Sequence, residues 1–359
     1  MKRKVNKYRG FLLVLFYLLA VLFVVSCSKD RTKRNLKAMW IENAFQSLTF
    51  GDFPRVKAVS WWNENFGSSL LRIDSSPEAL DAYRKGVSQY NFITQAVFVN
   101  QKLIPPQNSL TFYHGAFPDF GSTEDQVSKD KIEAFENLAQ KKIVWAYFSN
   151  NWGDSIEFPE QQVEAILAAG KVPFIRIMPR SQFTEGVADP KYTLQKIING
   201  DFDNQLRFWA QKAKNIESPL LIDFAPEMNG NWFPWSGYLN GGGIKNGYGD
   251  PAIPDGPERY RDAYRHIVTL FRQWGVNNIT WFFHVNAEEY PKKVWNKIAN
   301  YYPGDDYVDW VGVSVYGPQK SDEEYRDFKE ILTDSYNDLC KMTKKPIAVL
   351  EFGVTEMDE

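Results

Sequence analysis

The sequence predicts a (β/α)8 barrel, in which eight parallel strands are surrounded by helices. Apolar runs of strand length alternate with amphipathic stretches of helix length, and this alternation indicates parallel strands joined by right-handed crossovers. The chain has 359 residues and a hydrophobic content of 44%, which suits one barrel of about 250 residues with insertions. Two of the apolar runs also lead into a glutamate, as expected where barrel strands end at an active site.

The first residues do not belong to this barrel. Lys and Arg are frequent up to Arg9, and residues 11–25 are apolar and uncharged. This layout predicts a secretory signal, because the apolar core is too short to span a bilayer comfortably. The run ends in Val24-Val25-Ser26-Cys27, which resembles a bacterial lipobox. The alternatives are a plain transmembrane anchor, or an ordinary signal followed by a chance cysteine.

The lipobox resemblance implies cleavage before Cys27 and a lipid on its sulfur. Residues 1–26 would then be a lipoprotein signal peptide and residues 27–35 a lipidated tether to the bacterial cell envelope, since several acyl chains attach stably to a membrane. Ser28 after the cysteine is compatible with sorting to the outer membrane by the usual rule for lipoproteins. The other cysteine, Cys340, leaves the mature chain without an internal disulfide.

The barrel elements follow in order. Residues 36–48 are predicted as an amphipathic helix, 55–62 as a strand and 77–90 as a second helix. Seven further strands are expected at 110–117, 143–148, 172–178, 220–225, 279–284, 308–315 and 346–350, with helices between them at 123–140, 159–169, 202–216, 257–274, 291–300 and 322–342.

Seven strands do not close such a barrel, and a helix, a strand and a helix are what should follow the seventh. We therefore predict a circular permutation, in which the eighth strand precedes the first; barrel termini lie close together, so this rearrangement is topologically simple. One domain would span 36–359, with 36–92 as the relocated part and 93–359 carrying strands one to seven. The alternative is a truncated barrel preceded by the remnant of another module.

Two glutamates follow apolar runs. Residues 219–222 precede Glu227, and residues 346–350 directly precede Glu351. Because strand ends on one side of a barrel share a site, both carboxyl groups are expected to meet there. Glycoside hydrolysis with retention needs two carboxyl groups about 5 Å apart, one as acid and then base, the other as nucleophile. A single glutamate would be better explained by a buried salt bridge or a loop cap.

Aromatic residues follow the first of these glutamates, at Trp232, Phe233 and Trp235. Flat apolar rings can stack on pyranose rings, and a nearly dry pocket keeps a carboxylic acid protonated near neutral pH. The combination of a carboxyl group and several rings therefore points to a sugar site.

Composition and spacing argue against other classes of protein. The formal net charge is −2 and no basic face stands out after the signal, so we expect no nucleic-acid partner. The histidines His114, His266 and His284 lack metal-ligand spacing, so no metal site is expected. Gly241 to Gly243 do not follow a strand to open a helix, so they do not form a phosphate-binding loop. We expect no cofactor.

Several blocks of the sequence form a known pattern. They are 200–202 with Trp209-Ala210, 227–235 (Glu-Met-Asn-Gly-Asn-Trp-Phe-Pro-Trp), 302–316 and 351–353. These blocks resemble glycoside hydrolase family 26, which is best known for endo-β-mannanases and also contains mixed-linkage β-glucanases and β-1,3-xylanases. The segments 38–41, 53–58 and 74–77 resemble the C-terminal end of the family, in line with a permuted chain.

The resemblance implies roles for individual residues. Glu227 would be the acid/base and Glu351 the nucleophile, so that a glycosyl-enzyme intermediate forms and configuration is retained. Tyr316 falls where the family places a tyrosine that hydrogen-bonds the nucleophile, which would orient it and help to keep it ionised.

Further residues are expected to contact the substrate. Trp232 matches an aromatic residue beside the acid/base, and Asn229 lies in the same block. Trp61 or Trp62 matches a tryptophan that floors the central subsite; since neighbouring residues on a strand point to opposite faces, at most one of the two should face the sugar. For each of these residues the alternative is core packing.

The chain departs from the family pattern at Pro226, where family mannanases usually have a histidine. Proline has no side-chain donor and no backbone N–H, so the contact of that histidine must be absent or supplied elsewhere. This puts mannan as the substrate in doubt. The Gly- and Pro-rich insertion 236–255 should wall one side of the cleft.

Together these observations predict a monomeric, lipid-anchored, retaining endo-glycosidase that acts on a β-linked polysaccharide and contacts a membrane through Cys27. β-Mannan is the first expectation, with mixed-linkage β-glucan or β-1,3-xylan next. A different class, a surface glycan-binding lipoprotein that has lost catalysis, is the main alternative, and a non-functional fragment is a weaker one.

Overall fold

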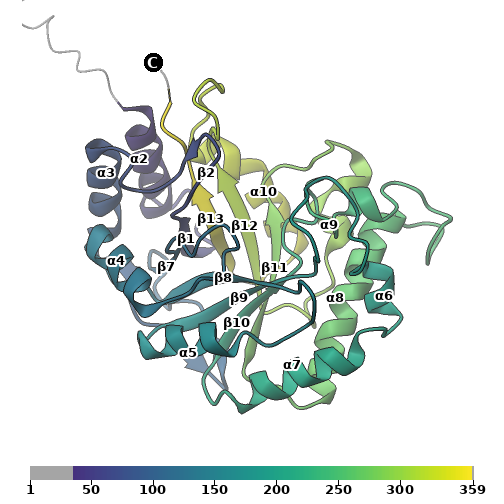
Figure 1. The fold of residues 1–359 in the computed structure, drawn as a ribbon. Helices are drawn as coiled ribbons and strands as arrows, with labels where there is room; N and C mark the ends of the chain where they lie inside the picture. The colour runs from purple at the N-terminus through teal and green to yellow at the C-terminus, as the bar shows by residue number, and fades with distance from the viewer. Residues whose placement is uncertain (1–34, 358–359) are drawn as a thin grey trace, which may run out of the picture. The chain divides into compact units, whose positions relative to one another are not determined.

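Eight parallel strands form a closed barrel (Figure 1) in the computed structural model, which describes residues 35–357. The predicted signal peptide and Cys27 lie outside these residues. The barrel strands are β1 (Val56–Trp62), β7 (Phe112–Phe117), β8 (Trp145–Asn151), β9 (Val172–Met178), β10 (Leu220–Phe224), β11 (Ile279–Asn286), β12 (Trp310–Tyr316) and β13 (Ile347–Gly353). The predicted (β/α)8 barrel is therefore confirmed.

Strand β1 closes the barrel. It pairs in parallel with β13 on one side, where Val56 lies opposite Ile347, and with β7 on the other, where Ala58 lies opposite Tyr113. The strand that the sequence assigns to the relocated segment thus takes a full place in the ring. The truncated-barrel alternative is wrong for the described residues, whereas the evolutionary permutation itself stays a prediction.

Helices lie outside the strands (Figure 1). The helices are α2 (Leu36–Thr49), α3 (Pro77–Ser88), α4 (Lys129–Ala139), α5 (Glu160–Ala168), α6 (Leu194–Ile198), α7 (Asp203–Asn215), α8 (Asp255–Gln273), α9 (Ile298–Tyr301) and α10 (Phe328–Met342), with 3₁₀ turns η1 (Gly237–Asn240) and η2 (Val294–Asn296). Short strands complete the described part: β2 (Asn65–Phe66) with β3 (Ser69–Leu70), β5 (Phe98–Val99) with β6 (Lys102–Leu103), and β4 (Phe92–Ile93) beside β7.

Three helix predictions need correction. The helix predicted at 123–140 begins only at Lys129, because the side chain of Ser128 caps it, and the one predicted at 322–342 begins at Phe328, after the cap Asp327; a capping side chain satisfies the first free N–H groups and fixes the start. The segment 291–300 is not one helix but the 3₁₀ turn η2 followed by the start of α9, with Lys297 between them. There the Asn296 side-chain amide donates to the carbonyls of Asn229 and Pro291, so contacts with the loop of Glu227 accompany the interruption.

The first described helix, α2, packs against the barrel through buried side chains. Trp40 on α2 is fully buried, and its ring packs edge-on against Trp61 of β1 and Phe328 of α10. Its indole N–H donates to the Arg326 carbonyl at 3.1 Å. Large buried aromatic side chains contribute several kcal/mol each through burial and ring contacts, so α2 and β1 are held by the rest of the chain.

The insertion after β10 is a folded loop. Asp255 accepts a hydrogen bond from the Gly247 N–H at 2.9 Å, and Arg259 donates to the Asn240 carbonyl at 2.8 Å. Gly256 lies so close to the loop that a Cβ there would stand 2.2 Å from the Gly237 oxygen, which only glycine permits. These contacts fix the loop, which follows Glu227 in the sequence, to the first turns of α8.

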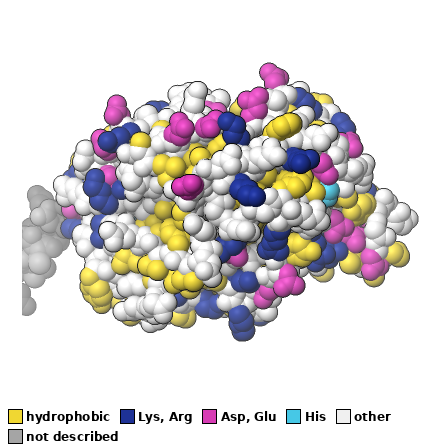
Figure 2. Space-filling view, turned by 90° about the horizontal axis from the view of Figure 1, so that it is seen from below, with side chains coloured by type: hydrophobic (Ala, Val, Ile, Leu, Met, Phe, Trp, Pro, Cys, Tyr) yellow, Lys and Arg dark blue, Asp and Glu magenta, His cyan; other side chains and the backbone are white. Residues whose placement is uncertain are grey.

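The surface carries mixed charges. Lys and Arg side chains are interspersed with Asp and Glu and with hydrophobic side chains over the face shown in Figure 2. Among residues 35–357, no helix combines the length and apolar character needed to cross a membrane.

Candidate active site

Glu227 and Glu351 meet at the C-terminal ends of the strands. Glu227 lies three residues beyond β10, whereas Glu351 lies within β13, and the two side chains are only 7% and 4% exposed. One oxygen of each carboxyl group and one ring nitrogen of His284 all lie within 4.8 Å of one another. The structure thus brings together the two carboxyl groups that the sequence singled out.

The backbone turn that carries Glu227 is strained and firmly held. Ala225 and Glu227 both have positive φ angles, 51° and 57°, on either side of Pro226. Such angles cost about 1 kcal/mol or more for residues with a Cβ and persist where the surroundings enforce them. Here the Glu227 N–H donates to the His284 carbonyl at 2.9 Å, and the Trp235 indole donates to the Pro226 carbonyl at 2.7 Å.

The Glu227 carboxyl group is held by a neighbouring indole. The Trp232 indole donates to its Oε2 at 2.9 Å, which places Trp232 beside the predicted acid/base. Ser314 on β12 lowers the pKa of this carboxyl group. Residue 226 offers no side-chain donor here, and its carbonyl is taken by Trp235.

A β-bulge positions Glu351. Val313 pairs with Val349, but Ser314 pairs with Glu351, so one residue is skipped between β12 and β13. A bulge of this kind re-aims the following side chain. It brings Glu351 level with Ser314 and therefore toward Glu227.

Three donors surround Glu351. The Tyr316 hydroxyl donates to Oε2 at 2.9 Å, the Tyr147 hydroxyl lies 3.3 Å from Oε1, and the Arg176 guanidinium lies 3.4 Å from Oε1. Arg176 is itself buried and also contacts Glu124 at 3.1 Å. These groups favour a negative charge on Glu351.

Burial raises the pKa of both carboxyl groups. For Glu351, burial raises the pKa to about 7, Glu227 adds to the rise, and Arg176 and Tyr316 oppose it. For Glu227, burial again raises the pKa, and Ser314, Arg176 and Trp232 oppose the rise. Two carboxyl groups so close share one proton near neutral pH. Because the guanidinium touches Glu351 directly, we place the charge on Glu351 and the proton on Glu227.

The two tryptophans of β1 point to opposite sides, as the strand period requires. Trp61 is 0% exposed, and its indole donates to the Leu71 carbonyl at 3.1 Å. Trp61 therefore packs in the core, which was the alternative considered for it, and the contact of one of the two tryptophans with substrate stays a prediction. Trp62 lies on the side of the glutamates, with its ring 5.0 Å from the Arg176 guanidinium and stacked on Phe117 at 4.0 Å.

Asn229 is buried beside the end of β11. It is 0% exposed, its amide nitrogen donates to the Asn286 carbonyl at 2.8 Å, and its amide oxygen accepts from the Asn286 N–H at 2.9 Å. Its contact with substrate stays a prediction. Asn229 fastens the turn of Glu227 to the end of β11.

Sequence reasoning missed Arg176, Tyr147, Asp223 and Ser314. A signal was present for two of them, because Arg176 and Asp223 are single charged residues inside otherwise apolar strands. A charge in such a strand must face a polar interior or a partner. Tyr147 and Ser314 are unremarkable in the sequence, since strands often contain tyrosine and serine.

The group formed by Glu227, His284 and Glu351 has the spacing of a metal site, but its imidazole is already occupied. His284 Nδ1 lies 2.7 Å from Asp223 Oδ2, and Nε2 lies 2.8 Å from Ser314 Oγ. A metal ligand needs a free lone pair on one ring nitrogen. The hydrogen-bonded imidazole thus fits a polar network better than a metal.

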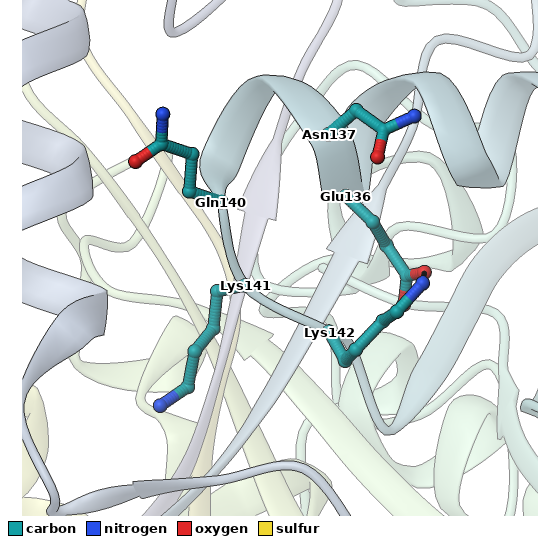
Figure 3. A pocket seen from close by; sticks show the side chains of 5 residues that line it. All are labelled: Glu136, Asn137, Gln140, Lys141 and Lys142. Carbon is teal, nitrogen blue, oxygen red and sulfur yellow. Dashed lines mark hydrogen bonds and ion pairs between the residues drawn. The ribbon is translucent and has the colours of Figure 1, made fainter.

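A depression of about 260 Å³ lies elsewhere, at the end of α4 (Figure 3). Its lining includes Glu136, whose carboxyl group contacts Lys142 at 2.7 Å, accepts from the Ile143 N–H at 2.8 Å and pairs with Lys171. These contacts satisfy the carboxylate and join α4 to the start of β8. The depression therefore has a structural explanation and lies away from the strand ends that carry Glu227.

Comparison with known proteins agrees with this geometry. A model of glycosyl hydrolase family 26 matches residues 176–349. Endoglucanase H of Acetivibrio thermocellus is 26% identical over 235 residues, which are 65% of this chain and 23% of that protein. The β-1,3-xylanase TXYA of a Vibrio species is 24% identical over 127 residues, or 35% of this chain and 23% of that protein.

A third relative, mannan endo-1,4-β-mannosidase A and B of Caldalkalibacillus mannanilyticus, is 29% identical over 190 residues, or 50% of this chain and 30% of that protein. The chain thus spans 23% to 30% of the length of these three relatives. The matched range contains the turn of Glu227 and the residues Arg176, His284 and Ser314. The matched part of the chain, residues 176–349, belongs to glycosyl hydrolase family 26.

Proposed function

We propose that this protein hydrolyses a β-linked polysaccharide with retention of configuration. The observation that carries the proposal is the pair of buried carboxyl groups, Glu227 and Glu351, whose oxygens approach within 4.8 Å. That separation suits a retaining mechanism, because an inverting one needs room for a water molecule between the carboxyl groups, about 6.5–9.5 Å.

Each glutamate has one role in the first step. The Glu351 carboxylate, oriented by Tyr316 and Arg176, attacks the anomeric carbon, while Glu227 gives its proton to the departing glycosidic oxygen. A glycosyl ester on Glu351 forms as the glycosidic bond breaks. In the second step Glu227, now a carboxylate, takes a proton from water, whose oxygen attacks the anomeric carbon and releases Glu351.

The substrate is proposed to be β-1,4-mannan first, with mixed-linkage β-glucan and β-1,3-xylan as alternatives. The relatives carry the names of a mannosidase, an endoglucanase and a β-1,3-xylanase, which supports a β-linked polymer without choosing the sugar. Pro226 leaves its position without the side-chain donor of the family histidine, and this favours testing the glucan and the xylan alongside mannan.

A glycan-binding protein without catalysis is the second candidate. It would keep the aromatic rings at the site but would not need Arg176, a buried cation, against Glu351. A buried charge is costly unless it is paired, so the Arg176–Glu351 pair supports an enzyme over a binding protein.

Release of reducing sugar tests the proposal. The detergent-solubilised full chain is incubated with β-mannan, mixed-linkage β-glucan and β-1,3-xylan, and binding to each polymer is measured in parallel. Reducing ends from one polymer would identify the substrate. Binding without release would instead support the glycan-binding candidate.

A plot of kcat/KM against pH should be bell-shaped. Glu351 must be ionised to attack, so kcat/KM should fall as pH drops through its raised pKa, near 7, which is far above the ordinary glutamate value of about 4.3. On the alkaline side activity falls when the pair loses its shared proton from Glu227.

Tyr316→Phe removes a donor that lowers the Glu351 pKa, so the acid limb of the variant's pH profile should move to higher pH. An acid limb near pH 4, unchanged in Tyr316→Phe, would contradict this.

We further propose that the protein is a lipoprotein of the cell envelope, anchored through Cys27 outside the described residues. Its support is the basic and apolar start of the chain followed by the lipobox-like Ser26-Cys27. Cys27→Ser should abolish incorporation of a labelled fatty acid and move the protein from the membrane to the soluble fraction. Cys340→Ser is the matched control, and lipid labelling that persists in Cys27→Ser would disprove the anchor.

A further inference from the structure

Arg180 is a buried cation without an ion pair. It lies two residues beyond β9 and is only 7% exposed. Its Nε donates to the Asn151 side-chain oxygen at 2.7 Å. Within residues 35–357, no carboxylate pairs with its guanidinium, and neither terminal nitrogen, Nη1 or Nη2, has a hydrogen-bond partner. A buried charge is costly unless it is paired, so this arginine needs an explanation outside the packing of the barrel.

The terminal nitrogens of Arg180 lie at the surface of the protein. Fully buried polar atoms without a partner occur in the described part of the chain, for example Nε of Arg176, but none of them belongs to Arg180. Nη1 and Nη2 therefore form part of the small area of this side chain that solvent reaches. Burial lowers the pKa of Arg180 to about 10, Glu124 opposes the fall and Arg176 adds to it, so the guanidinium stays charged at neutral pH.

The neighbours of Arg180 hold its guanidinium by the faces and by one edge. The carbon of the guanidinium lies 4.4 Å from the centre of the Phe183 ring and 5.8 Å from the centre of the Phe233 ring. Aromatic rings attract a cation placed over them, and Asn151 fixes the Nε edge. The edge with Nη1 and Nη2 is left for a ligand. Two parallel N–H groups of this kind match two oxygens of a carboxylate or a sulfate group.

This edge belongs to the same end of the barrel as the glutamates. Phe233, which lies against Arg180, follows Trp232, whose indole donates to Glu227 at 2.9 Å. The loop after Arg180 reaches the same place, because the Gly186 N–H donates to the Trp232 carbonyl at 2.7 Å. A polysaccharide that extends from Glu227 along this wall therefore passes Arg180.

A comparison with Arg176 shows what Arg180 lacks. Arg176, four residues earlier, contacts Glu124 at 3.1 Å and Glu351 at 3.4 Å. The carboxylates that act on Arg180 are Glu124 and Glu185. The first of them is held by Arg176, and the second stands on an exposed loop without an ion pair to Arg180 in the described structure. A ligand is the remaining source of a counter-charge in direct contact.

We propose that Arg180 binds an anionic group of the polysaccharide, either the carboxylate of an acidic sugar unit or a sulfate ester. The inference deepens the proposed function and rests on it for the presence of a polysaccharide in the site. Unmodified mannan, β-glucan and β-xylan are neutral, so the natural substrate would be a β-linked polymer with acidic substituents. The ring of Phe183, which is 51% exposed, offers a flat surface beside the guanidinium for the sugar that bears the anion.

Binding to matched polymers tests the proposal. The probes are neutral, carboxymethylated and sulfated forms of β-mannan, mixed-linkage β-glucan and β-1,3-xylan, titrated calorimetrically into the full chain in a non-ionic detergent. Every protein carries Glu227→Gln, so that the polymers stay intact. One anionic form should bind about 30-fold more tightly than its neutral parent, the size of effect when a buried charge gains a hydrogen-bonded partner. The preferred form distinguishes a carboxylate from a sulfate, and equal affinity for all forms would overturn the proposal.

Three variants show whether Arg180 causes the preference. Arg180→Gln removes the charge and should remove most of the preference, whereas Arg180→Lys keeps the charge without the planar fork and should keep a smaller preference. The matched control is Arg207→Gln, which removes the charge of an exposed arginine on α7 and should keep the full preference. A preference that survives in Arg180→Gln would overturn the proposal. Equal weakening of neutral and anionic polymers would also overturn it, because Arg180 would then contact sugar hydroxyl groups.

The result for this subsite is separate from the result for hydrolysis. Tight binding of an anionic polymer that is lost in Arg180→Gln, with no reducing sugar released by the chain that keeps Glu227, would support the subsite and contradict the enzyme. Cleavage of a neutral polymer without any preference for its anionic forms would do the reverse. Thermal unfolding checks each variant. If Arg180→Gln does not fold, Arg180→Lys decides, because its preference must be smaller than that of the parent protein.

Discussion

Replacing Glu351 by alanine is expected to lower kcat on the susceptible polysaccharide by about 10⁴-fold or more, in the range seen when a catalytic nucleophile is removed. Without this carboxylate no glycosyl ester can form, and the remaining residues only bind the chain. The measurement is initial-rate release of reducing sugar from the polymer that the wild-type protein cleaves. Substrate binding should persist, because the aromatic residues at the site are unchanged.

Three controls make the Glu351 result specific. Glu164→Ala changes an exposed glutamate on α5 and should keep full activity. Since Glu351→Ala leaves Arg176 with Glu124 as its remaining ion pair, its thermal unfolding must also be recorded. Azide, a small nucleophile, should restore turnover in Glu351→Ala and give a glycosyl azide of inverted configuration. Wild-type activity in a folded Glu351→Ala variant would show that another residue is the nucleophile.

Replacing Glu227 by alanine should have an effect that depends on the leaving group. On polysaccharide the loss is expected to be about 10²–10⁴-fold, the usual contribution of a general acid. On an aryl glycoside with an acidic phenol the bond-breaking step needs little proton donation, so that step should be affected far less. Steady-state and pre-steady-state rates on a series of aryl glycosides measure this difference.

Trp232→Phe is the matched variant for Glu227. It keeps an aromatic ring but removes the indole N–H that donates to Glu227 at 2.9 Å. The variant should therefore lose much less activity than Glu227→Ala and keep the wild-type dependence of rate on the leaving group. If Glu227→Ala lost the same rate on good and poor leaving groups, Glu227 would not be the acid.

The barrel could be predicted because its signal is local. Each buried parallel strand is an apolar run and each helix has an amphipathic period, so the positions of the eight strands were predicted to within a few residues, including β1 at the front. The glutamates were also recognisable, because a carboxyl group that follows an apolar run is unusual. The prediction was less accurate for segments such as 291–300, where the Asn296 side chain donates to the loop of Glu227 and two short turns stand in place of one helix.

The sequence by itself determined the ring of strands and the two carboxyl groups, since both follow from which residue types stand next to one another along the chain. Only the tertiary structure decided what surrounds the carboxyl groups. Whether Trp61 or Trp62 faces the site depends on which face of β1 lies toward the glutamates. The pairing of Glu351 with Ser314 depends on the residue that is skipped between β12 and β13. The hydrogen bonds that link Tyr147, Asp223, His284 and Ser314 join four strands whose register is set by closing the barrel, and no pattern along the sequence encodes that register.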